Sequence, residues 1–291
     1  MSVKHPIIVV TGSSGAGTST VKHTFDQIFR REGITAASIE GDAFHRYDRL
    51  AMREAIAHAE RTGNRQFSHF CPEANLLDEL GEVFREFSET GSARTRHYVH
   101  DQVEAERYGA EPGTFTDWEP LPEGTDILFY EGLHGAAVTD TVDLAQYGDL
   151  KFGVVPVINL EWIQKLHRDK RHRGHTEEAI TDTILRRMPA YVKTITPQFS
   201  RTDINFQRVP VVDTSNPFIA RTIPTADESM VVIRFRDPRG IDFSYLLSML
   251  QGSWMSRANS IVIPGGKLDL AMQLILTPMV HRLVDNARRA A

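Results

Sequence analysis

The stretch IIVVTGSSGAGTST, Ile7–Thr20, joins an apolar run directly to a glycine-rich segment. Gly12 and Gly17 bracket four residues, and Ser19 stands where a phosphate-binding P-loop places the hydroxyl that meets magnesium. Thr18 occupies the position at which that pattern has lysine. An apolar strand before the loop and a helix after it favour a phosphate-binding loop over a simple glycine-rich turn. The expected ATP-binding residues are Gly12, Ser13, Ser14, Gly15, Ala16, Gly17, Thr18, Ser19 and Thr20.

The rest of the chain continues the pattern of an α/β protein. Strands are predicted at Ile7–Thr11, Thr35–Glu40, Asp126–Glu131, Leu150–Leu160, Val209–Asp213, Met230–Phe235 and Ser260–Pro264. Helices are predicted at Thr18–Glu32, Arg49–Arg61, Ala74–Phe87 and Lys267–Ala290, and in residues 161–174. The order strand, loop, helix, strand predicts a parallel sheet, and turn signals after residue 204 predict an antiparallel C-terminal flank. We expect a three-layer α/β fold of the P-loop NTPase type, with a mixed, mainly parallel sheet and helices on both faces, as one kinase domain over residues 1–291.

Composition excludes several classes of function. The formal charge of −5 argues against nucleic-acid binding, which normally goes with a basic excess. The apolar run near the start is too short for a signal peptide, and no segment is long and apolar enough for a membrane span, so a cytoplasmic location is expected. Cys71 is the single cysteine, which rules out an internal disulfide.

A carboxylate and two basic residues follow the second predicted strand, in SIEGDAFHRYDR, Ser38–Arg49. Ligands of parallel sheets bind at the carboxyl ends of the strands, so Asp42 is expected beside the P-loop. There it could accept the proton of an attacking hydroxyl, and His45 and Arg49 could bind an anionic sugar phosphate. A capping Asp followed by solvated basic residues is the alternative.

Two further segments supply acids and cations. Glu131 ends the strand DILFYEG, where many P-loop enzymes place a carboxylate for magnesium, although a strand-end Glu can also be merely solvated. In residues 161–174, Lys165, Arg168 and Asp169 recur at helical spacing, so one helix face could form a lid over the transferred phosphoryl group. Either Lys165 or Arg168 could replace the lysine absent at Thr18, and a solvated basic helix face is the alternative.

Two groups of residues lack a motif. Tyr98 and His100 are candidates for substrate contacts. The scattered arginines Arg31, Arg234 and Arg257 could bind an anionic effector or pair with acids at a subunit contact.

The motifs together resemble one family. GSSGAGTST with threonine in the lysine position, EGDAFHRYDR, YEGLHG, VVPVINLEWIQKLHRD and QRVPVVDTSNPFIARTIPTADES resemble the proteobacterial type of phosphoribulokinase, within the P-loop kinase superfamily, from end to end. The resemblance implies transfer of the ATP γ-phosphoryl group to the 1-hydroxyl of ribulose 5-phosphate, which gives the bisphosphate used in carbon dioxide fixation by the Calvin cycle.

The resemblance also implies roles for individual residues. Asp42 would be the general base, and Lys165 would lie near the nucleotide. The magnesium residues would be Ser19, Glu131 and Asp169. The residues for the sugar phosphate and the developing charge would be His45, Arg49, Arg168 and Arg173.

Regulation and assembly are implied by the resemblance alone. Plant-type relatives are switched by a cysteine pair, whereas Cys71 has no partner, so thioredoxin control is not expected. The bacterial type is activated by NADH, inhibited by AMP and forms a large homo-oligomer, with an octamer as the candidate size. Arg31, Arg234 and Arg257 are our hypothesis for the effector site.

Other functions use the same loop and sheet. A uridine or pantothenate kinase is the nearest alternative, but its uncharged acceptor would have less use for so many arginines. A nucleotide-hydrolysing switch or a nonhydrolysing binding module would leave Asp42 and the strand-end acids without a purpose.

Overall fold

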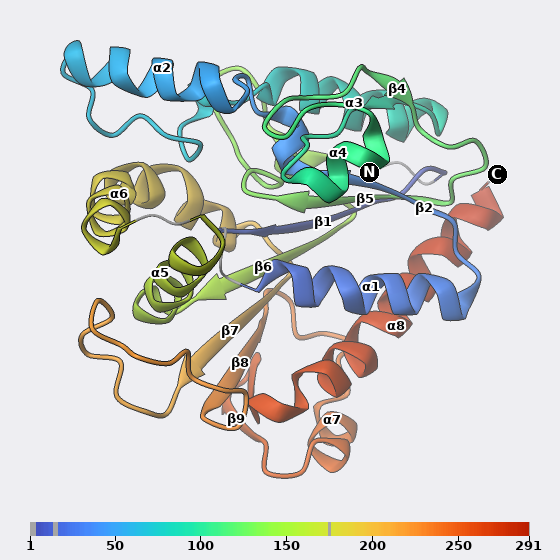
Figure 1. Cartoon of the computed structure of the whole chain (residues 1–291). Coiled ribbons are helices and arrows are strands. Elements are labelled where there is room, and N and C mark those ends of the chain that lie inside the picture. The colour runs from blue at the N-terminus through green and yellow to red at the C-terminus, as the bar shows by residue number, and fades with distance from the viewer. Residues whose placement is uncertain (1–3, 14–16, 174–175, 291) are drawn as a thin grey trace.

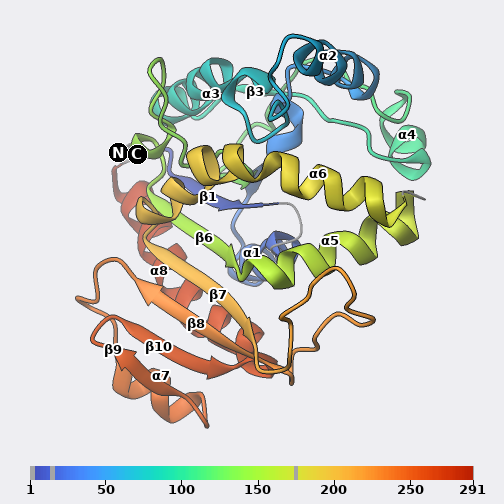
Figure 2. The ribbon, with the colours of Figure 1, turned by 90° about the vertical axis from the view of Figure 1, so that its left-hand side faces the viewer.

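A mixed sheet of eight strands forms the middle layer of the structure, a computed structural model that describes residues 4–13, 17–173 and 176–290. The strand order is β2-β5-β1-β6-β7-β8-β10-β9, and Figure 2 shows its β1-to-β9 part side by side. The strands are β1 (Ile7–Gly12), β2 (Ala36–Glu40), β5 (Ile127–Gly132), β6 (Leu150–Pro156), β7 (Ile204–Pro210), β8 (Ser229–Phe235), β9 (Trp254–Arg257) and β10 (Ser260–Pro264). From β2 to β7 neighbouring strands are parallel, and from β7 to β9 they are antiparallel. The predicted mixed sheet with an antiparallel C-terminal flank is confirmed.

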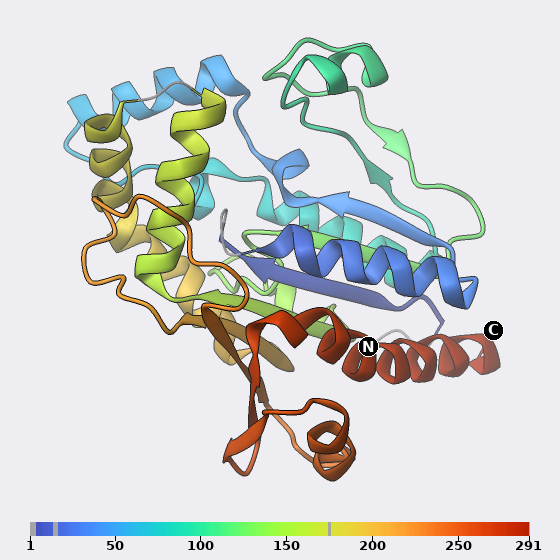
Figure 3. The same ribbon diagram turned by 60° about the horizontal axis from the view of Figure 1, so that its bottom comes forward.

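Helices cover both faces of this sheet (Figure 1). The helices are α1 (Thr18–Glu32), α2 (Arg49–Arg61), α3 (Leu77–Thr90), α4 (Gln102–Tyr108), α5 (Ile158–Arg173), α6 (Glu177–Ala190), α7 (Phe243–Met249) and α8 (Leu268–Ala290). A small second sheet pairs β3 (Arg94–Thr95) with β4 (Glu119–Pro120). In Figure 3, α5 and α6 lie at the same end of the sheet as α2. Among the described residues no helix is both long and apolar enough to cross a bilayer.

The first strand shows why its sequence is apolar throughout. Ile8 and Val10 pack into the core under α1 and α8, whereas Ile7 and Val9 pack into the core under α3. Alternate side chains of a strand point to opposite faces, so a strand covered on both faces needs apolar residues at every position. Burial of each such side chain stabilises the fold by roughly 1.5–3 kcal/mol.

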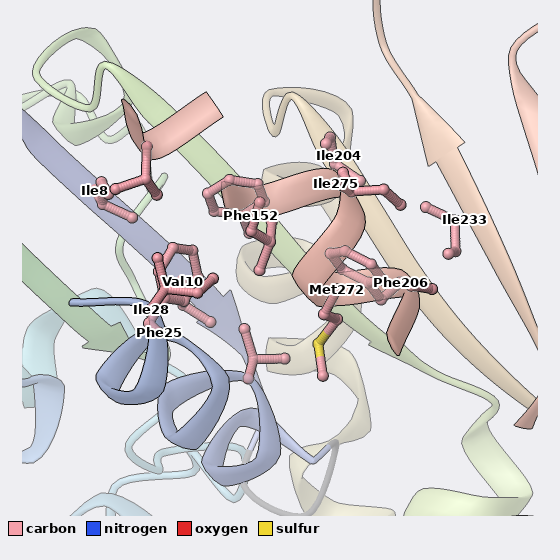
Figure 4. Packing of buried hydrophobic residues seen from close by; sticks show 14 of the residues in the cluster. Ile8, Val10, Phe25, Ile28, Phe152, Ile204, Phe206, Ile233, Met272 and Ile275 are labelled. Carbon is pink, nitrogen blue, oxygen red and sulfur yellow. The ribbon is translucent and has the colours of Figure 1, made fainter. Parts of the chain in front are cut away.

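The core under α1 and α8 is built around aromatic rings (Figure 4). The ring centroid of Phe25 lies 5.3 Å from that of Phe152 on β6 and 5.0 Å from that of Phe129 on β5. Met272 and Ile275 of α8 pack into the same cluster. These packing contacts fix the position of α1 on the sheet, and therefore the position of the helix start that follows the glycine loop.

Two predicted strands have wrong boundaries. The predicted strand Leu150–Leu160 ends at Pro156, because its pairing with β7 ends there and α5 begins at Ile158. The predicted strand Val209–Asp213 overlaps only the end of β7, which begins at Ile204 because β6 and β8 pair with the chain from that residue on.

The helix predictions are mostly confirmed. Helices α1 and α2 have the predicted boundaries, and α8 begins one residue later than predicted. The prediction Ala74–Phe87 is shifted, because Asn75 is extended and Gly91, with a left-handed φ of 75°, ends α3. The sequence pattern does not predict α4, α6, α7 or β9, and in α6 the internal Pro189 is typical of a helix end rather than a helix.

Candidate active site

The glycine loop begins at the carboxyl end of β1 and leads into α1. A Cβ atom on Gly12 would lie 2.8 Å from Cγ2 of Thr18 and 2.9 Å from the carbonyl oxygen of Val154, so only glycine fits there. Gly17 has a φ of 100°, which also favours glycine. The backbone thus brings the N-terminal end of α1 close to the strand end, where helix amides can bind an anion. Ser14, Gly15 and Ala16, and the side chain of Ser19, lie outside the described residues.

Asp42 lies just beyond β2 in a 3₁₀ turn, Gly41–Phe44, and its side chain is 40% exposed. Two imidazoles flank the carboxylate. Nε2 of His45 lies 3.4 Å from Oδ1, and Nε2 of His100 lies 3.6 Å from Oδ2. Asp42 does not cap this turn with its side chain, so the capping alternative is not supported.

His45 is held in a buried stack of rings. Its ring lies 3.9 Å from that of His69, centroid to centroid, and 6.0 Å from that of Tyr98. Burial lowers the pKa of His45, although the Asp42 carboxylate opposes the change, so the imidazole is neutral at neutral pH. The guanidinium of Arg96 donates to the backbone carbonyls of Ala43 and His45 and fixes the turn that carries Asp42.

Arg49 comes next along the chain and begins α2. Asp48 caps this helix by accepting from the amide of Ala51 at 2.8 Å. Nη2 of Arg49 donates to the carbonyl of His100 at 2.7 Å, and the rings of His100 and Tyr98 are 4.9 Å apart. The structure therefore brings Tyr98 and His100, two candidates for substrate contacts, close to Asp42 and Arg49.

A further histidine, His134, supports this group. His134 follows β5, and its Nε2 is 3.1 Å from the side-chain nitrogen of Asn75 and 2.9 Å from the carbonyl of His69. Burial lowers the pKa of His134 to about 4, so its ring stays neutral. The position of His45 is supported by His69, Asn75 and His134. No spacing pattern in the sequence indicates these three residues.

Helix α5 carries four of the predicted residues: Lys165, Arg168, Asp169 and Arg173. Both Lys165 and Arg168 bind the buried carboxylate of Asp169, with Nε of Arg168 at 3.1 Å. Burial lowers the pKa of Lys165, and the Asp169 carboxylate opposes that change. Lys165 and Arg168, the two candidates to replace the missing lysine, therefore bind the same acid. The side chain of Arg173 lies outside the described residues.

Glu131 is the last residue but one of β5 and pairs with Val10 of β1. Burial raises its pKa, and the hydroxyl of Thr18 and the charge of Lys22 lower it.

Lys22, one helical turn after Thr18, donates to Glu40 at 2.5 Å. Burial alone would lower the pKa of Lys22, but the hydrogen bond and charge of Glu40 raise it overall. Neither Lys22 nor Glu40 is among the predicted site residues, although their places in α1 and at the end of β2 are a usable signal.

The donors present fit a magnesium ion held mainly by nucleotide phosphates. No preformed cluster of three metal-binding side chains exists among the described residues, and magnesium in kinases needs only one or two carboxylates besides phosphate and water. Glu131 offers a buried carboxyl group beside the first turn of α1, where such an ion would lie.

A cleft of about 800 Å³ joins these groups. Of the predicted residues, those that line it are Asp42, His45, Arg49, Tyr98, His100, Lys165 and Arg168. Glu131 and Asp169 do not line it. Residues that the sequence analysis misses come from several elements and include Arg53, Glu161, Trp162, Arg187 and Tyr191. Arg187 belongs to α6, a helix that the sequence pattern does not predict, and its guanidinium lies 6.0 Å from the ring centroid of Phe70.

The three arginines of the effector hypothesis lie outside this cleft. Arg31, near the end of α1, donates to Gln273 and Thr277 of α8. Arg234 and Arg257 face Ser260 of β10 from its two neighbouring strands. Two of the three therefore share one part of the sheet, and their role stays a prediction.

Comparisons with known proteins agree with this geometry. Residues 7–215 match the model of the Phosphoribulokinase / Uridine kinase family. The chain is 70% identical to Phosphoribulokinase of Xanthobacter flavus and 69% identical to Phosphoribulokinase 1 of Cereibacter sphaeroides, each over 290 residues and the whole of both chains. The solved structure of phosphoribulokinase from Rhodobacter spheroides superposes with a TM-score of 0.92 at 66% identity and covers 99% of this chain and 100% of that one. The chain belongs to the phosphoribulokinase / uridine kinase family.

Proposed function

We propose that this chain is a phosphoribulokinase, an ATP-dependent kinase whose acceptor is the 1-hydroxyl of ribulose 5-phosphate. Full-length relatives of that name at 65–70% identity support the activity. One observation of the structure carries the chemistry: a single cleft holds a partly exposed carboxylate, Asp42, and cations from two helices, Arg49 of α2 and Lys165 and Arg168 of α5. This arrangement suits an acceptor that is an alcohol and also carries a phosphate.

The reaction needs a base for the acceptor hydroxyl. Asp42 takes the hydroxyl proton while the oxygen bonds to the γ-phosphorus and the bond to the β-phosphate oxygen breaks, which leaves ADP. The imidazoles of His45 and His100, at 3.4 and 3.6 Å, hold the carboxylate in place. Because Asp42 lies beyond the end of β2, at the same sheet edge as the glycine loop, it can reach a hydroxyl aimed at the nucleotide.

The cations have two tasks in this proposal. Arg49, Arg168 and Arg173 bind the sugar phosphate together with His45, and Lys165 faces the nucleotide as the substitute for the missing lysine. When α5 and α6 close over the cleft, water is excluded and these charges act more strongly on the transferred phosphoryl group.

Magnesium would be held by Ser19, Glu131 and Asp169 together with the phosphates. When bound, it neutralises charge on the nucleotide. Asp169 is at present shared by Lys165 and Arg168, so the protein already balances the charge of that carboxylate.

We extend the proposal to regulation and assembly. NADH would activate and AMP inhibit the enzyme through a site that includes Arg31, Arg234 and Arg257, in a cytoplasmic homo-oligomer of up to eight subunits that serves the Calvin cycle. Charge reversal by Arg234→Glu should weaken NADH activation and leave activity without NADH unchanged. Unchanged activation in this variant would exclude Arg234 from the effector site.

The activity is tested by ADP formation from ATP and magnesium with ribulose 5-phosphate, uridine, pantothenate or no acceptor. ADP formed only with ribulose 5-phosphate is expected. Acceptor-independent hydrolysis would indicate a nucleotide switch, and activity on uridine or pantothenate would mean that the cationic cleft has been misinterpreted.

The base is tested by Asp42→Asn, which keeps the size of the side chain and removes its basicity. Turnover should fall by about 10² to 10⁴, whereas ATP affinity should change little. Asp48→Asn, which alters the neighbouring helix cap, is the matched control. Near-full turnover of Asp42→Asn would rule out Asp42 as the base.

A further inference from the structure

Glu161 is a buried carboxyl group to which the proposed reaction assigns no role. It lies in the first turn of α5, is 6% exposed and lines the cleft. Glutamate is seldom buried this deeply without a partner of opposite charge or a task.

Two hydroxyl groups from other parts of the fold approach this carboxyl group. Ser13 is the first residue after β1 and is fully buried, and Tyr191 begins a π-helical turn, Tyr191–Ile195, directly after α6. Among the described residues, Oε2 of Glu161 and the Ser13 hydroxyl are nevertheless buried without a hydrogen bond of ordinary geometry. Unsatisfied buried polar atoms are rare in folded proteins, and those that persist commonly have a functional reason.

The same carboxyl group lies next to the cation of α5. Glu161, Lys165 and Asp169 follow one another at intervals of four, so they share one face of the helix. Lys165 therefore stands between two acids, and in this structure it binds Asp169. The charges of Lys165 and Arg168 both act on Glu161.

We propose that Glu161 is a positioning residue that ties Ser13, at the start of the glycine loop, to the first turn of α5 and to Tyr191 after α6, and that orients Lys165 toward the nucleotide. The inference rests on the proposed role of Lys165. Glu161 gives α5 and α6 a direct connection to Ser13, at the start of the phosphate-binding loop.

The proton of Glu161 offers a readout that a purely structural residue would lack. Burial raises its pKa to about 7, against the effects of Ser13, Tyr191, Lys165 and Arg168, which are the groups that face it. The ionised carboxylate can attract Lys165 away from Asp169, and the neutral acid can only hydrogen-bond. The position of Lys165 should therefore change with pH near neutrality.

The test compares Glu161→Gln and Glu161→Ala with the wild-type enzyme from pH 6 to 9, with Glu178→Gln, an exposed glutamate of α6, as control. Glu161→Ala should raise the KM for ATP about tenfold and the KM for ribulose 5-phosphate less than twofold. Glu161→Gln should largely restore the KM for ATP, because glutamine keeps the shape of the side chain and its amide can hydrogen-bond a neighbouring hydroxyl. It should abolish the inflection near pH 7 in the profile of kcat/KM for ATP.

Three results would overturn the proposal: an unchanged KM for ATP in Glu161→Ala, equal increases in both KM values, or an inflection near pH 7 that persists in Glu161→Gln. If Glu161→Ala does not fold, the proposal is tested by Glu161→Gln alone, through its pH profile of kcat/KM for ATP and its affinity for ADP measured by calorimetry. Activity of the wild-type protein on ribulose 5-phosphate tests the proposed function separately. Failure of the proposed role of Glu161 can therefore be distinguished from failure of the proposed kinase activity.

Discussion

Replacement of Glu161 by glutamine should stabilise the folded protein, and more strongly as the pH rises. The folded state raises the pKa of this carboxyl group from 4.5 to about 7 through burial. Below pH 4.5 the carboxyl group is protonated in both the folded and the unfolded chain, so its ionisation does not change the free energy of unfolding. Between pH 4.5 and 7 the unfolded chain ionises first, so the folded state progressively loses stability relative to it.

The magnitude follows from the two pKa values. At about 1.4 kcal/mol for each pH unit, the difference between 4.5 and about 7 corresponds to a penalty of about 3 kcal/mol above pH 7. Glutamine has nearly the same shape and never ionises, so Glu161→Gln removes this penalty. In a chain of this length about 3 kcal/mol corresponds to roughly 5 °C in Tm.

The assay is thermal unfolding of the wild type and Glu161→Gln at pH 5 and pH 8. The gain in Tm should be small at pH 5 and about 5 °C larger at pH 8. Glu86→Gln, an exposed glutamate of α3, is the control and should show no such difference. Equal effects of Glu161→Gln at both pH values, or a loss at pH 8, would refute the reasoning and show that Lys165 stabilises the ionised form.

Three further predictions concern the loop and the core. Lys22→Met should lower the free energy of unfolding by on the order of 1 kcal/mol or less, because its ion pair with Glu40 is partly exposed. In a double-mutant cycle measured by urea unfolding, adding Glu40→Gln should recover part of this loss, and strictly additive effects of the two substitutions would contradict the pairing. Gly12→Ala should raise the KM for ATP strongly, because its Cβ would lie 2.8 Å from Cγ2 of Thr18, and a wild-type KM would show that the loop can shift freely. Phe152→Ala should cost about 3–5 kcal/mol of stability in urea unfolding, because the side chain is fully buried, and a loss below about 1 kcal/mol would mean that the core closes over the cavity.

Much of the site can be predicted from local patterns. Asp42 and Glu131 follow apolar strands, and parallel strands place their carboxyl ends at one edge of a sheet, so their proximity to the glycine loop follows from sequence order. Lys165 and Asp169 are four residues apart on one helix, and the structure pairs them. Such predictions succeed because the geometry that they use is set by a few neighbouring residues.

Other members of the site depend on contacts between distant segments. Glu161 meets Ser13 and Tyr191 only after α5 and α6 have packed at the end of the sheet, and the pKa of its carboxyl group results from that burial. His134 becomes a neutral support for His45 by the same means. No spacing in the sequence indicates that these side chains will be removed from water.

The sequence by itself determined most strands of the sheet, the helices α1, α2 and α8, the phosphate-binding loop and the strand-end acids, because hydrophobic periodicity and backbone preferences act over short distances. Only the tertiary structure decided where β6 ends, where β7 begins and ends, that α6 lines the cleft, and that Lys165 and Arg168 share Asp169. These features depend on which neighbours a segment finds in space, and pairing, burial and charge balance are properties of that arrangement rather than of any one stretch of residues.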